Sequence, residues 1–266
     1  MAASIESTAR CISAVIITKN AAGELPACLA SVAFCDEILV VDSGSQDTTV
    51  ALAKGLGARV IETHWRGFGP QKQFAIEQAA HDWVLCVDAD ERVSAQLAKE
   101  VTNGVSPAPT GKPALTQATA YRFARRNRFM GKYLRHGEGY PDWSLRLFDR
   151  RAARWSDDAV HEKVVVNQGE IGSLAGDLLH ESAESLDNYL AKQNRYSTLA
   201  AEVALAQGKR ANVAQLLFSP VVRFIKFYFF RLGFLDGIAG LVHILIGCTA
   251  SFAKYAKMLA GQKSLP

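Results

Sequence analysis

Several features that define other classes of protein are absent from this 266-residue sequence. It has no uninterrupted apolar run of about eighteen residues, the length that predicts a membrane-spanning helix. The nearest approach, Leu232 to Phe252, contains Asp236 and His243, and a buried Asp236 would be costly in lipid. The first dozen residues also lack a charged start followed by an apolar stretch, so we expect no signal peptide.

Cysteine is scarce and its spacing is irregular. The five cysteines, an odd number, match no zinc-site pattern; they are Cys11, Cys28, Cys35, Cys86 and Cys248. Cys86 lies inside an apolar run, which favours a core position. This usage is typical of a reducing compartment, and we expect a cytoplasmic protein.

Charge is nearly balanced, with 30 Lys and Arg against 26 Asp and Glu and a net charge of +4. This permits an anionic partner without requiring one, and we expect no nucleic-acid partner. One local run stands out, because no acid interrupts it: Arg122, Arg125, Arg126, Arg128, Lys132 and Arg135. A solvated face and a binding site for an anionic substrate are both compatible with it.

The first ninety residues alternate between short apolar runs and helical segments. This order predicts a parallel sheet built from βαβ units. The expected strands are 13–18, 37–42, 59–62 and 82–88, and the expected helices are 25–32, 48–54 and 70–80. Neither Gly-x-Gly-x-x-Gly nor a Walker loop follows the first strand, so a dinucleotide or P-loop nucleotide is not expected.

The pattern changes after Asp90. We expect a helix from Ser94 to about Gly104, and a longer helix from Glu184 to Gln207. Further strands are expected at 118–125, 143–148 and 163–166, and two or three short helices after Val213, broken at Gly208, Pro220, Gly233 and Gly237. The predicted organisation is one main domain over 1–210, with a first half at about 11–105 and a second half at about 115–210. An apolar and basic helical extension occupies 211–266.

Three of the predicted strands end in polar residues, namely Thr18-Lys19-Asn20, Asp42-Ser43-Gly44-Ser45 and Asp88-Ala89-Asp90-Glu91. Loops after parallel strands meet at one edge of a sheet, which is where ligands bind. Asp88 and Asp90 supply the oxygen ligands that Mg²⁺ or Mn²⁺ requires beside a substrate phosphate; a solvated turn is the alternative. Asp42 suits a nucleoside hydroxyl or base N–H, and Gly44 allows close backbone approach.

Together these segments resemble a known family. The order and spacing of Ile16-Ile-Thr-Lys-Asn20, Val40-Val-Asp-Ser-Gly-Ser45 and Val87-Asp-Ala-Asp-Glu91 are similar to the family-two inverting glycosyltransferases of GT-A fold. Later segments resemble the subgroup of lipopolysaccharide core β-1,4-glucosyltransferases: Tyr140-Pro-Asp-Trp143, Arg146-Leu-Phe148, Val160-His-Glu162 and Gly233-Phe-Leu-Asp-Gly237. The resemblance runs from Ser13 to Lys257. It implies an α/β fold with a Rossmann-like, mainly parallel sheet, followed here by the C-terminal helical extension.

The resemblance also assigns roles. It implies a UDP-sugar donor, held by Thr18, Asn20, Asp42, Ser43, Gly44, Lys72 and Asp88, and a divalent metal on Asp90, Asp88 and His180. Lys72 could equally be an exposed helix lysine, and His180 a capping histidine. The transferred sugar is expected to be glucose, and the acceptor an anionic glycolipid of the inner lipopolysaccharide core.

Inverting transfer is a single displacement, so it needs a base on the acceptor hydroxyl. The candidates are Glu162, Asp142 and His161, with Glu162 preferred because it precedes an apolar strand. The basic run after Arg122 would pair with acceptor phosphates or carboxylates.

The region after Val213 mixes cationic and aromatic residues, which suits a membrane interface. We therefore expect peripheral attachment to the cytoplasmic face of the inner membrane; a helical lid is the alternative.

Three other functions stay open at this level. A sugar-phosphate nucleotidyltransferase would share the sheet and the metal, but would release pyrophosphate rather than nucleoside diphosphate. A polyprenol-phosphate sugar synthase would differ in its lipid-phosphate acceptor. A carbohydrate- or membrane-binding module without enzymatic activity would not need the paired aspartates.

Overall fold

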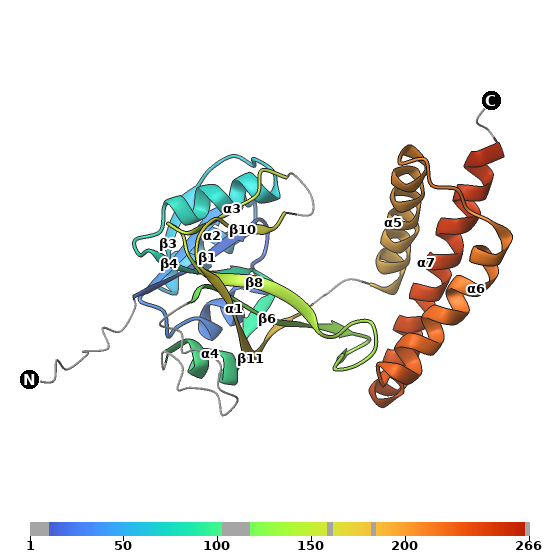
Figure 1. Ribbon diagram of the computed structural model, residues 1–266. Coiled ribbons are helices and arrows are strands. Elements are labelled where there is room, and N and C mark those ends of the chain that lie inside the picture. Colours follow the sequence, from blue (N-terminus) through green and yellow to red (C-terminus); the bar gives the residue numbers. More distant parts are fainter. Residues whose placement is uncertain (1–10, 103–117, 159–161, 182–184, 264–266) are drawn as a thin grey trace, which may run out of the picture. The chain divides into compact units, whose positions relative to one another are not determined.

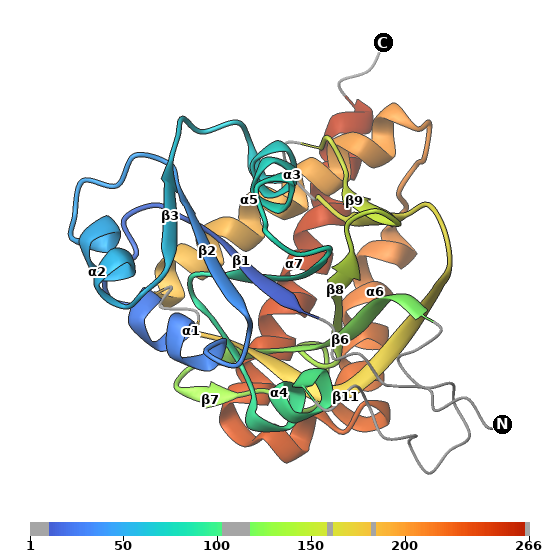
Figure 2. The same ribbon diagram turned by 90° about the vertical axis from the view of Figure 1, so that its left-hand side faces the viewer.

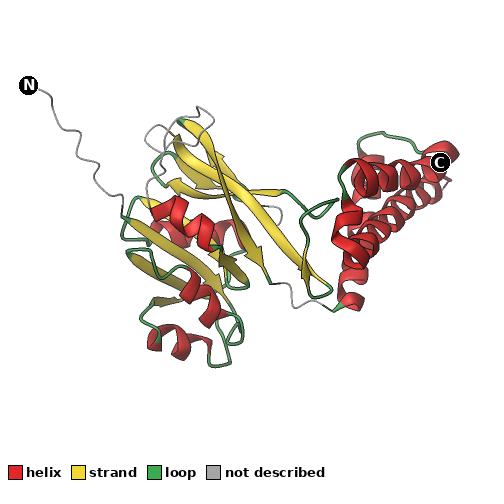
Figure 3. Cartoon of the chain, turned by 90° about the horizontal axis from the view of Figure 1, so that it is seen from below, coloured by secondary structure: helices red, strands yellow, loops and turns green. Residues whose placement is uncertain are grey.

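The computed structural model describes residues 11–102, 118–158, 162–181 and 185–263. Two compact units divide the chain. The first contains the residues up to Arg125 and Trp143–Glu181, and the second contains Arg126–Asp142 and the residues from Ser182 onward. Strands and helices alternate in the first unit, and long helices dominate the second (Figure 3).

The alternating elements predicted for the first ninety residues are all present in the first unit. The strands are β1 (Ile12–Thr18), β2 (Glu37–Asp42), β3 (Arg59–Glu62) and β4 (Trp83–Asp88), and the helices are α1 (Leu25–Ser31), α2 (Thr49–Gly55) and α3 (Phe68–Glu77). The predicted boundaries are correct to within about three residues. The largest differences are in α3, which begins before Pro70 and ends before Ala80.

These four strands are parallel and lie in the order β3-β2-β1-β4; Figure 2 shows β3, β2 and β1 side by side. The register pairs Thr18 with Asp42, and Ile17 with Asp88. The polar residues that follow each strand therefore meet at one edge of the sheet, as the sequence predicts. Ligands of other open α/β sheets also bind at this edge, beyond the carboxyl ends of the strands.

The remaining elements of the sheet come from the middle of the chain. They are β5 (Glu91–Val93), α4 (Ala95–Thr102), β6 (Ala118–Phe129), β8 (Asp142–Asp149), β9 (Ala153–Trp155), β10 (Val164–Val166) and β11 (Glu170–His180). The sheet continues from β4 in the order β8-β6-β11-β5, with β8 antiparallel to β4 and β5 antiparallel to β11. Strands β9 and β10 form a separate antiparallel pair.

Strand β11 was missed by the sequence analysis because two glycines and an aspartate interrupt its apolar pattern. A side chain at Gly172 would collide with the Tyr121 ring, and one at Gly176 would collide with the backbone of Leu97 in α4. Glycine inside a strand often marks such a close approach. Because these glycines have no side chain, β11 can pack closely against Tyr121 and Leu97. The local sequence does not reveal these contacts.

The core of the first unit lies on both faces of the sheet because successive side chains of a strand point to opposite faces. Ala14, Ile16 and Val40 contribute to the cluster that includes α1, α2 and α4. Val15 and Leu39 contribute to the other cluster, which includes α3. Helices α3 and α4 accordingly lie on opposite sides of the sheet (Figure 1). Cys86 is buried among the second set, as predicted.

The second unit contains the hairpin of β6 with β7 (Lys132–Tyr133) and the C-terminal helices. These are α5 (Leu186–Ala206), α6 (Val213–Phe224), the π-helix η1 (Ile225–Phe230), the 3₁₀-helix η2 (Gly233–Asp236) and α7 (Gly237–Lys263). Helix α7 packs against both α5 and α6 (Figure 1).

The prediction of short helices after Val213 is wrong for α7, which has 27 residues. Gly240 and Gly247 do not break it, because they lie where other segments approach closely: Gly240 meets the Gly233 carbonyl, and Gly247 meets the Glu138 carboxylate. The expected break at Pro220 is also wrong, since α6 continues through it. The breaks at Gly208, Gly233 and Gly237 are confirmed.

Asp236 connects the helices of the second unit to its hairpin segment. Its side chain is buried, and Oδ2 accepts hydrogen bonds from the backbone N–H groups of Arg135 (2.9 Å) and His136 (2.8 Å). The His136 Nδ1 lies 3.2 Å from Oδ1, and the Lys132 ammonium donates to the Asp236 carbonyl at 2.9 Å. One acid therefore satisfies several donors of the segment that follows β6.

We predict that Asp236→Ala lowers the free energy of unfolding by about 1–3 kcal/mol, since it leaves the partly buried backbone N–H groups of Arg135 and His136 without an acceptor. Chemical denaturation of the full chain measures this. Glu202→Ala, which removes an exposed acid from α5, is the matched control and should change stability by less than about 0.5 kcal/mol. Equal losses in both variants would contradict the anchoring role of Asp236.

Candidate functional site

The turn after β2 is organised by Asp42. The carboxylate is buried, and its Oδ2 accepts from the backbone N–H groups of Gly44 (2.9 Å) and Ser45 (2.8 Å). Gly44 has a φ of +83°, a value that favours glycine. Asp42 therefore holds its own turn in shape at the edge of the sheet.

Residues after β1 reach the same turn. The Asn20 backbone N–H donates to Ser45 Oγ at 2.8 Å, and Asn20 Oδ1 accepts from the Gln46 N–H at 2.7 Å. The Thr18 hydroxyl is buried and has no hydrogen-bond partner within the part of the chain that the structure describes. Two of the predicted nucleotide-binding loops are thus joined directly, and a polar group at the end of β1 remains to be satisfied.

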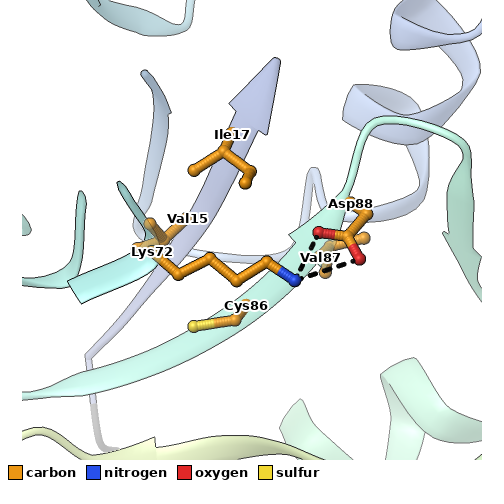
Figure 4. A pocket seen from close by; sticks show the side chains of 6 residues that line it. All are labelled: Val15, Ile17, Lys72, Cys86, Val87 and Asp88. Carbon is orange, nitrogen blue, oxygen red and sulfur yellow. Dashed lines mark hydrogen bonds and ion pairs between the residues drawn. The ribbon is translucent and has the colours of Figure 1, made fainter. Parts of the chain in front are cut away.

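Asp88 lies at the end of β4 between two buried cations. Its carboxylate accepts from Arg146 Nη2 at 2.9 Å, and the Lys72 ammonium lies 3.1 Å from Oδ1. Figure 4 shows the Lys72 side chain extended beside Val15 and Cys86, with its nitrogen directed at Asp88. Lys72 is buried, so the alternative of an exposed helix lysine is wrong.

Lys72 also contacts residues from a later part of the first unit. Its ammonium lies 2.8 Å from Glu162 Oε1 and 4.8 Å from the centre of the Trp155 ring. Because one lysine contacts both Asp88 and Glu162, a carboxylate from beyond residue 160 lies at the same edge as the polar strand ends. The structure therefore brings Asp88, Lys72 and Glu162 together.

Opposing effects set the charges of this cluster. Burial raises the pKa of Asp88, but the positive charges of Arg146 and Lys72 outweigh it and hold this pKa well below its usual range. Burial would lower the pKa of Arg146, yet Asp88 and Glu91 raise it above its ordinary value. Asp88 and Arg146 are thus both charged at neutral pH.

Glu91 is the most deeply buried acid of the cluster, and burial raises its pKa. Its Oε2 accepts from the Asp88 backbone N–H at 2.9 Å, and its Oε1 lies 3.5 Å from Arg146. Glu91 consequently fixes the turn that carries Asp88 and Asp90.

Asp90 and His180 form a second, more exposed pair. The Asp90 Oδ2 and His180 Nε2 atoms are 3.1 Å apart, because β5 and β11 pair in a register that places His180 opposite Glu91. Across the described ranges of the chain, no three His, Cys, Asp or Glu side chains gather into a cluster able to hold a metal. The pair nevertheless fits a divalent cation that takes its remaining ligands from substrate phosphate and water.

The three predicted catalytic candidates differ in their placement. Asp142 is the first residue of β8 and belongs to the second unit. His161 lies outside the described residues. Glu162 contacts this cluster through Lys72.

Sequence reasoning did not assign a role to Arg146, Glu91 or Trp155. Both Arg146 and Glu91 are buried. Arg146 carries a charge into the apolar stretch around Leu145 and Leu147, and this is a signal that could have found it, because a buried charge needs a partner. Glu91 stands among other charged residues, and no local signal marks it as buried. No local signal identifies Trp155, whose ring lies 4.8 Å from the Lys72 ammonium and 5.4 Å from the Arg146 guanidinium carbon.

Comparison with known proteins decides the family. The sequence model of glycosyl transferase family 2 matches residues 13–166, more than half of the chain. The chain belongs to this family. It is therefore a glycosyltransferase, and the predicted fold class, a mainly parallel α/β sheet of GT-A type followed by C-terminal helices, is confirmed. Membership decides against both the nucleotidyltransferase and the non-enzymatic module.

The transferase is similar over nearly its whole length to annotated relatives. It is 33% identical over 254 residues to the lipopolysaccharide core biosynthesis glycosyltransferase LpsC of Rhizobium meliloti, covering 93% of this chain and 91% of the relative. It is 32% identical over 259 residues to the uncharacterized glycosyltransferase RT0209 of Rickettsia typhi, covering 93% and 86%.

Solved structures overlap less closely with the transferase. The S. aureus TarS 1–349 complex with UDP covers 96% of this chain and 92% of that chain, with 13% identity and a TM-score of 0.47. Glucosyl-3-phosphoglycerate synthase from Mycobacterium tuberculosis, in complex with UDP, covers 45% and 46%, with 25% identity and a TM-score of 0.35. The family assignment rests on the sequence match instead.

We predict that Arg146→Met destabilises the transferase by about 3–5 kcal/mol, because it leaves the buried Glu91 carboxylate and the partly buried Asp88 carboxylate without their shared cation. Arg146→Lys should restore part of the loss. Arg154→Met is the control: its ion pair with Asp157 is exposed and 3.5 Å long, and such pairs contribute about 0–1 kcal/mol. Denaturant unfolding measures all three, and a small effect of Arg146→Met would contradict the proposed charge balance.

Proposed function

We propose that this glycosyltransferase moves a sugar, glucose, from a UDP-sugar to an anionic glycolipid of the inner lipopolysaccharide core, with inversion at the anomeric carbon. The observation that carries the proposal is the cluster of Asp88, Lys72, Arg146 and Glu162 at the edge where β1, β2 and β4 end. The acceptor class is supported by the similarity to LpsC, a lipopolysaccharide core biosynthesis glycosyltransferase.

The nucleotide would occupy the two joined loops after β1 and β2. Thr18 offers a buried hydroxyl without a partner in the described chain, and Asn20 and Ser43 supply further polar groups. Gly44 leaves the turn open, with no atom near the position where a Cβ would stand, so a ligand can approach the backbone closely. Asp42 shapes this turn and offers the uridine its carboxylate oxygens.

Lys72 and Arg146 are suited to the diphosphate end of the donor. Both are buried cations, and both now neutralise Asp88. Phosphate oxygens would bind beside two positive charges that are already in position. Such interactions are stronger in this partly buried site than in water. Asp88 would accept from the ribose or hold the diphosphate side together with these cations.

Asp90 and His180, with Asp88 nearby on the same turn, are the residues that would hold Mg²⁺ or Mn²⁺. A bound cation there would offset the negative charge on the leaving diphosphate. The exposed position of Asp90 suits this task better than the position of Asp88, whose charge already has two partners.

Glu162 is the preferred base for the acceptor hydroxyl. It contacts Lys72 at the donor edge, so the acceptor oxygen and the donor could meet beside it. Lys72 holds the Glu162 carboxylate in place, and donor phosphate that draws the ammonium away would leave Glu162 able to accept a proton. Asp142 and His161 remain the alternatives.

The acceptor half (about 115–210), which follows the nucleotide-sugar half (about 11–105), would present the basic run after Arg122 to the anionic acceptor. The helical extension (211–266) would hold the enzyme peripherally on the cytoplasmic face of the inner membrane, where glycolipid acceptors lie. A polyprenol-phosphate sugar synthase shares this donor site, and its lipid-phosphate acceptor is the feature that separates the two functions.

A donor and acceptor screen tests the function. Purified protein is incubated with UDP-glucose or other UDP-sugars, with and without truncated lipopolysaccharide or polyprenyl phosphate, and UDP release is measured. We expect release that depends on UDP-glucose and lipopolysaccharide. Release with polyprenyl phosphate instead would establish the alternative, and no release with any UDP-sugar would contradict the proposed donor.

Asp90→Ala should lower turnover by about a hundredfold or more, the scale of losing one electrostatic stabiliser of the leaving group, while the fold is retained. Asp157→Ala, which removes an exposed acid of the same unit, should leave turnover unchanged. Steady-state UDP release and a thermal unfolding scan measure both properties. Normal turnover in a folded Asp90→Ala variant would remove Asp90 from the mechanism.

Glu162→Gln keeps the size and hydrogen-bonding groups of the side chain but cannot accept a proton. We expect turnover to fall by about a hundred- to ten-thousandfold with donor affinity nearly unchanged. Asp142→Asn is the comparison variant, and titration calorimetry with UDP gives the affinity. A severe effect of Asp142→Asn with a mild effect of Glu162→Gln would exchange their roles; two mild effects would direct the test to His161.

A further inference from the structure

Charge is divided unequally between the two units. Residues 126–142 and 182–266, which make up the second unit, contain 14 Lys and Arg against 6 Asp and Glu, a formal net charge of +8. The remaining residues contain 16 against 20, a net charge of −4. The modest +4 of the whole chain thus conceals a strongly basic unit and an acidic one. Attraction to an anionic partner is therefore a property of the second unit.

The same unit exposes large apolar side chains along α6 and η1. We call this set the apolar face: Val213, Leu217, Phe218, Val221, Val222, Ile225, Phe229 and Phe230. Phe218 and Val222, one helical turn apart, are 64% and 62% exposed, and Phe230 is 79% exposed. Large apolar side chains left exposed in such number along one helical segment are typical of an interaction site in a folded protein.

Cations lie at both ends of the apolar face. Lys209 and Arg210 precede α6, and Lys226 and Arg231 lie in and after η1; all four are exposed. A helix with an apolar face and flanking cations is typical of binding in the plane of an anionic membrane. The charge complementarity selects an anionic lipid leaflet as the occupant, rather than an apolar protein surface.

Length and composition alone would also allow two membrane spans, at Val213–Phe230 and Gly233–Gln262. The packing of the second unit argues against them. Helix α7 packs along α5, which carries Asp187, Lys192, Arg195 and Glu202, and these charges would have to enter lipid with it. Asp236, the acid next to the face, is no obstacle to contact with lipid, because the Arg135 and His136 N–H groups satisfy its carboxylate inside the protein.

We propose that the second unit is a module that binds anionic membranes, with α6 and η1 lying in the plane of one leaflet and the apolar face in contact with acyl chains. Lys209, Arg210, Lys226 and Arg231 would then lie at the level of the lipid headgroups. The proposal rests on the membrane location given in the proposed function and assigns it to one surface and one kind of lipid. Binding through this face is separate from the donor site, which is built from residues of the first unit.

Flotation of the full chain with vesicles tests the module. We expect binding to vesicles of phosphatidylcholine that contain phosphatidylglycerol, and much weaker binding to phosphatidylcholine alone. Lys209→Gln combined with Arg210→Gln should weaken binding to the anionic vesicles about twenty-fivefold, from about fivefold per cation at a membrane surface. No binding of the wild-type chain to anionic vesicles would overturn the proposal.

A matched pair of double variants tests the face itself. Phe218→Glu with Val222→Glu should weaken binding at least about tenfold, because two apolar side chains no longer enter the leaflet. Leu199→Glu with Val203→Glu adds the same charges at the same spacing on α5, where the two side chains are 47% and 55% exposed. This control should lose less of its vesicle binding, and only because its added negative charges are repelled by the anionic lipid. Equal losses in the two double variants would overturn the assignment to α6.

Two further measurements test whether something other than a lipid leaflet covers the apolar face, and separate the membrane proposal from the proposed transferase function. Light scattering should show that the wild-type chain is a monomer, and a stable dimer sealed by the apolar face would overturn the proposal. Membrane attachment that resists carbonate extraction would overturn it as well, because it would indicate spanning helices. UDP release with a lipid-free core oligosaccharide should be equal in the wild type and in the Phe218→Glu, Val222→Glu variant. Absence of UDP release in both proteins would contradict the transferase function and would leave the vesicle-binding results unaffected.

Discussion

The ion pairs of the Asp88 carboxylate with two buried cations are the interactions on which the site depends. Lys72 comes from α3 and Arg146 from β8, so the acid at the end of β4 joins elements from both halves of the first unit. Each buried cation would be costly without a partner, and the partner would be costly without the cations. Their mutual neutralisation explains why charged groups persist beneath the edge of the sheet and why Glu162, paired with Lys72, is held there too.

The second unit differs from the first in which apolar side chains it buries. Its helices bury small residues such as Ala201 and Ala204 and leave larger apolar side chains of α6 and η1 exposed. An isolated protein in water gains nothing from this arrangement, because apolar surface left in water costs free energy. The basic net charge of the same residues, +8, supplies a reason for it, since it is complementary to an anionic lipid surface.

Much of the structure of the first ninety residues was predictable because strong local signals coincide there. Buried parallel strands need continuous apolar runs, and β1, β2 and β4 each show one before a polar or charged residue. The later half was less predictable. Strand β11 contains Gly172 and Gly176, which serve contacts with Tyr121 and Leu97 far away in the sequence, and α7 tolerates Gly240 and Gly247 for the same reason. Glycine is ambiguous in a sequence, because a turn and a close approach both select it.

The sequence by itself determined the family, the polar strand ends and the acidic, histidine and lysine candidates around them. Order along the chain carries this information, because the residues that follow parallel strands must meet at one edge. Only the tertiary structure decided that Lys72 is buried between Asp88 and Glu162, that Arg146 and Glu91 complete the charge balance, and that Asp90 lies against His180. Charges separated by up to about ninety residues became partners through strand pairing and packing, and no local pattern records which distant charge each one will meet.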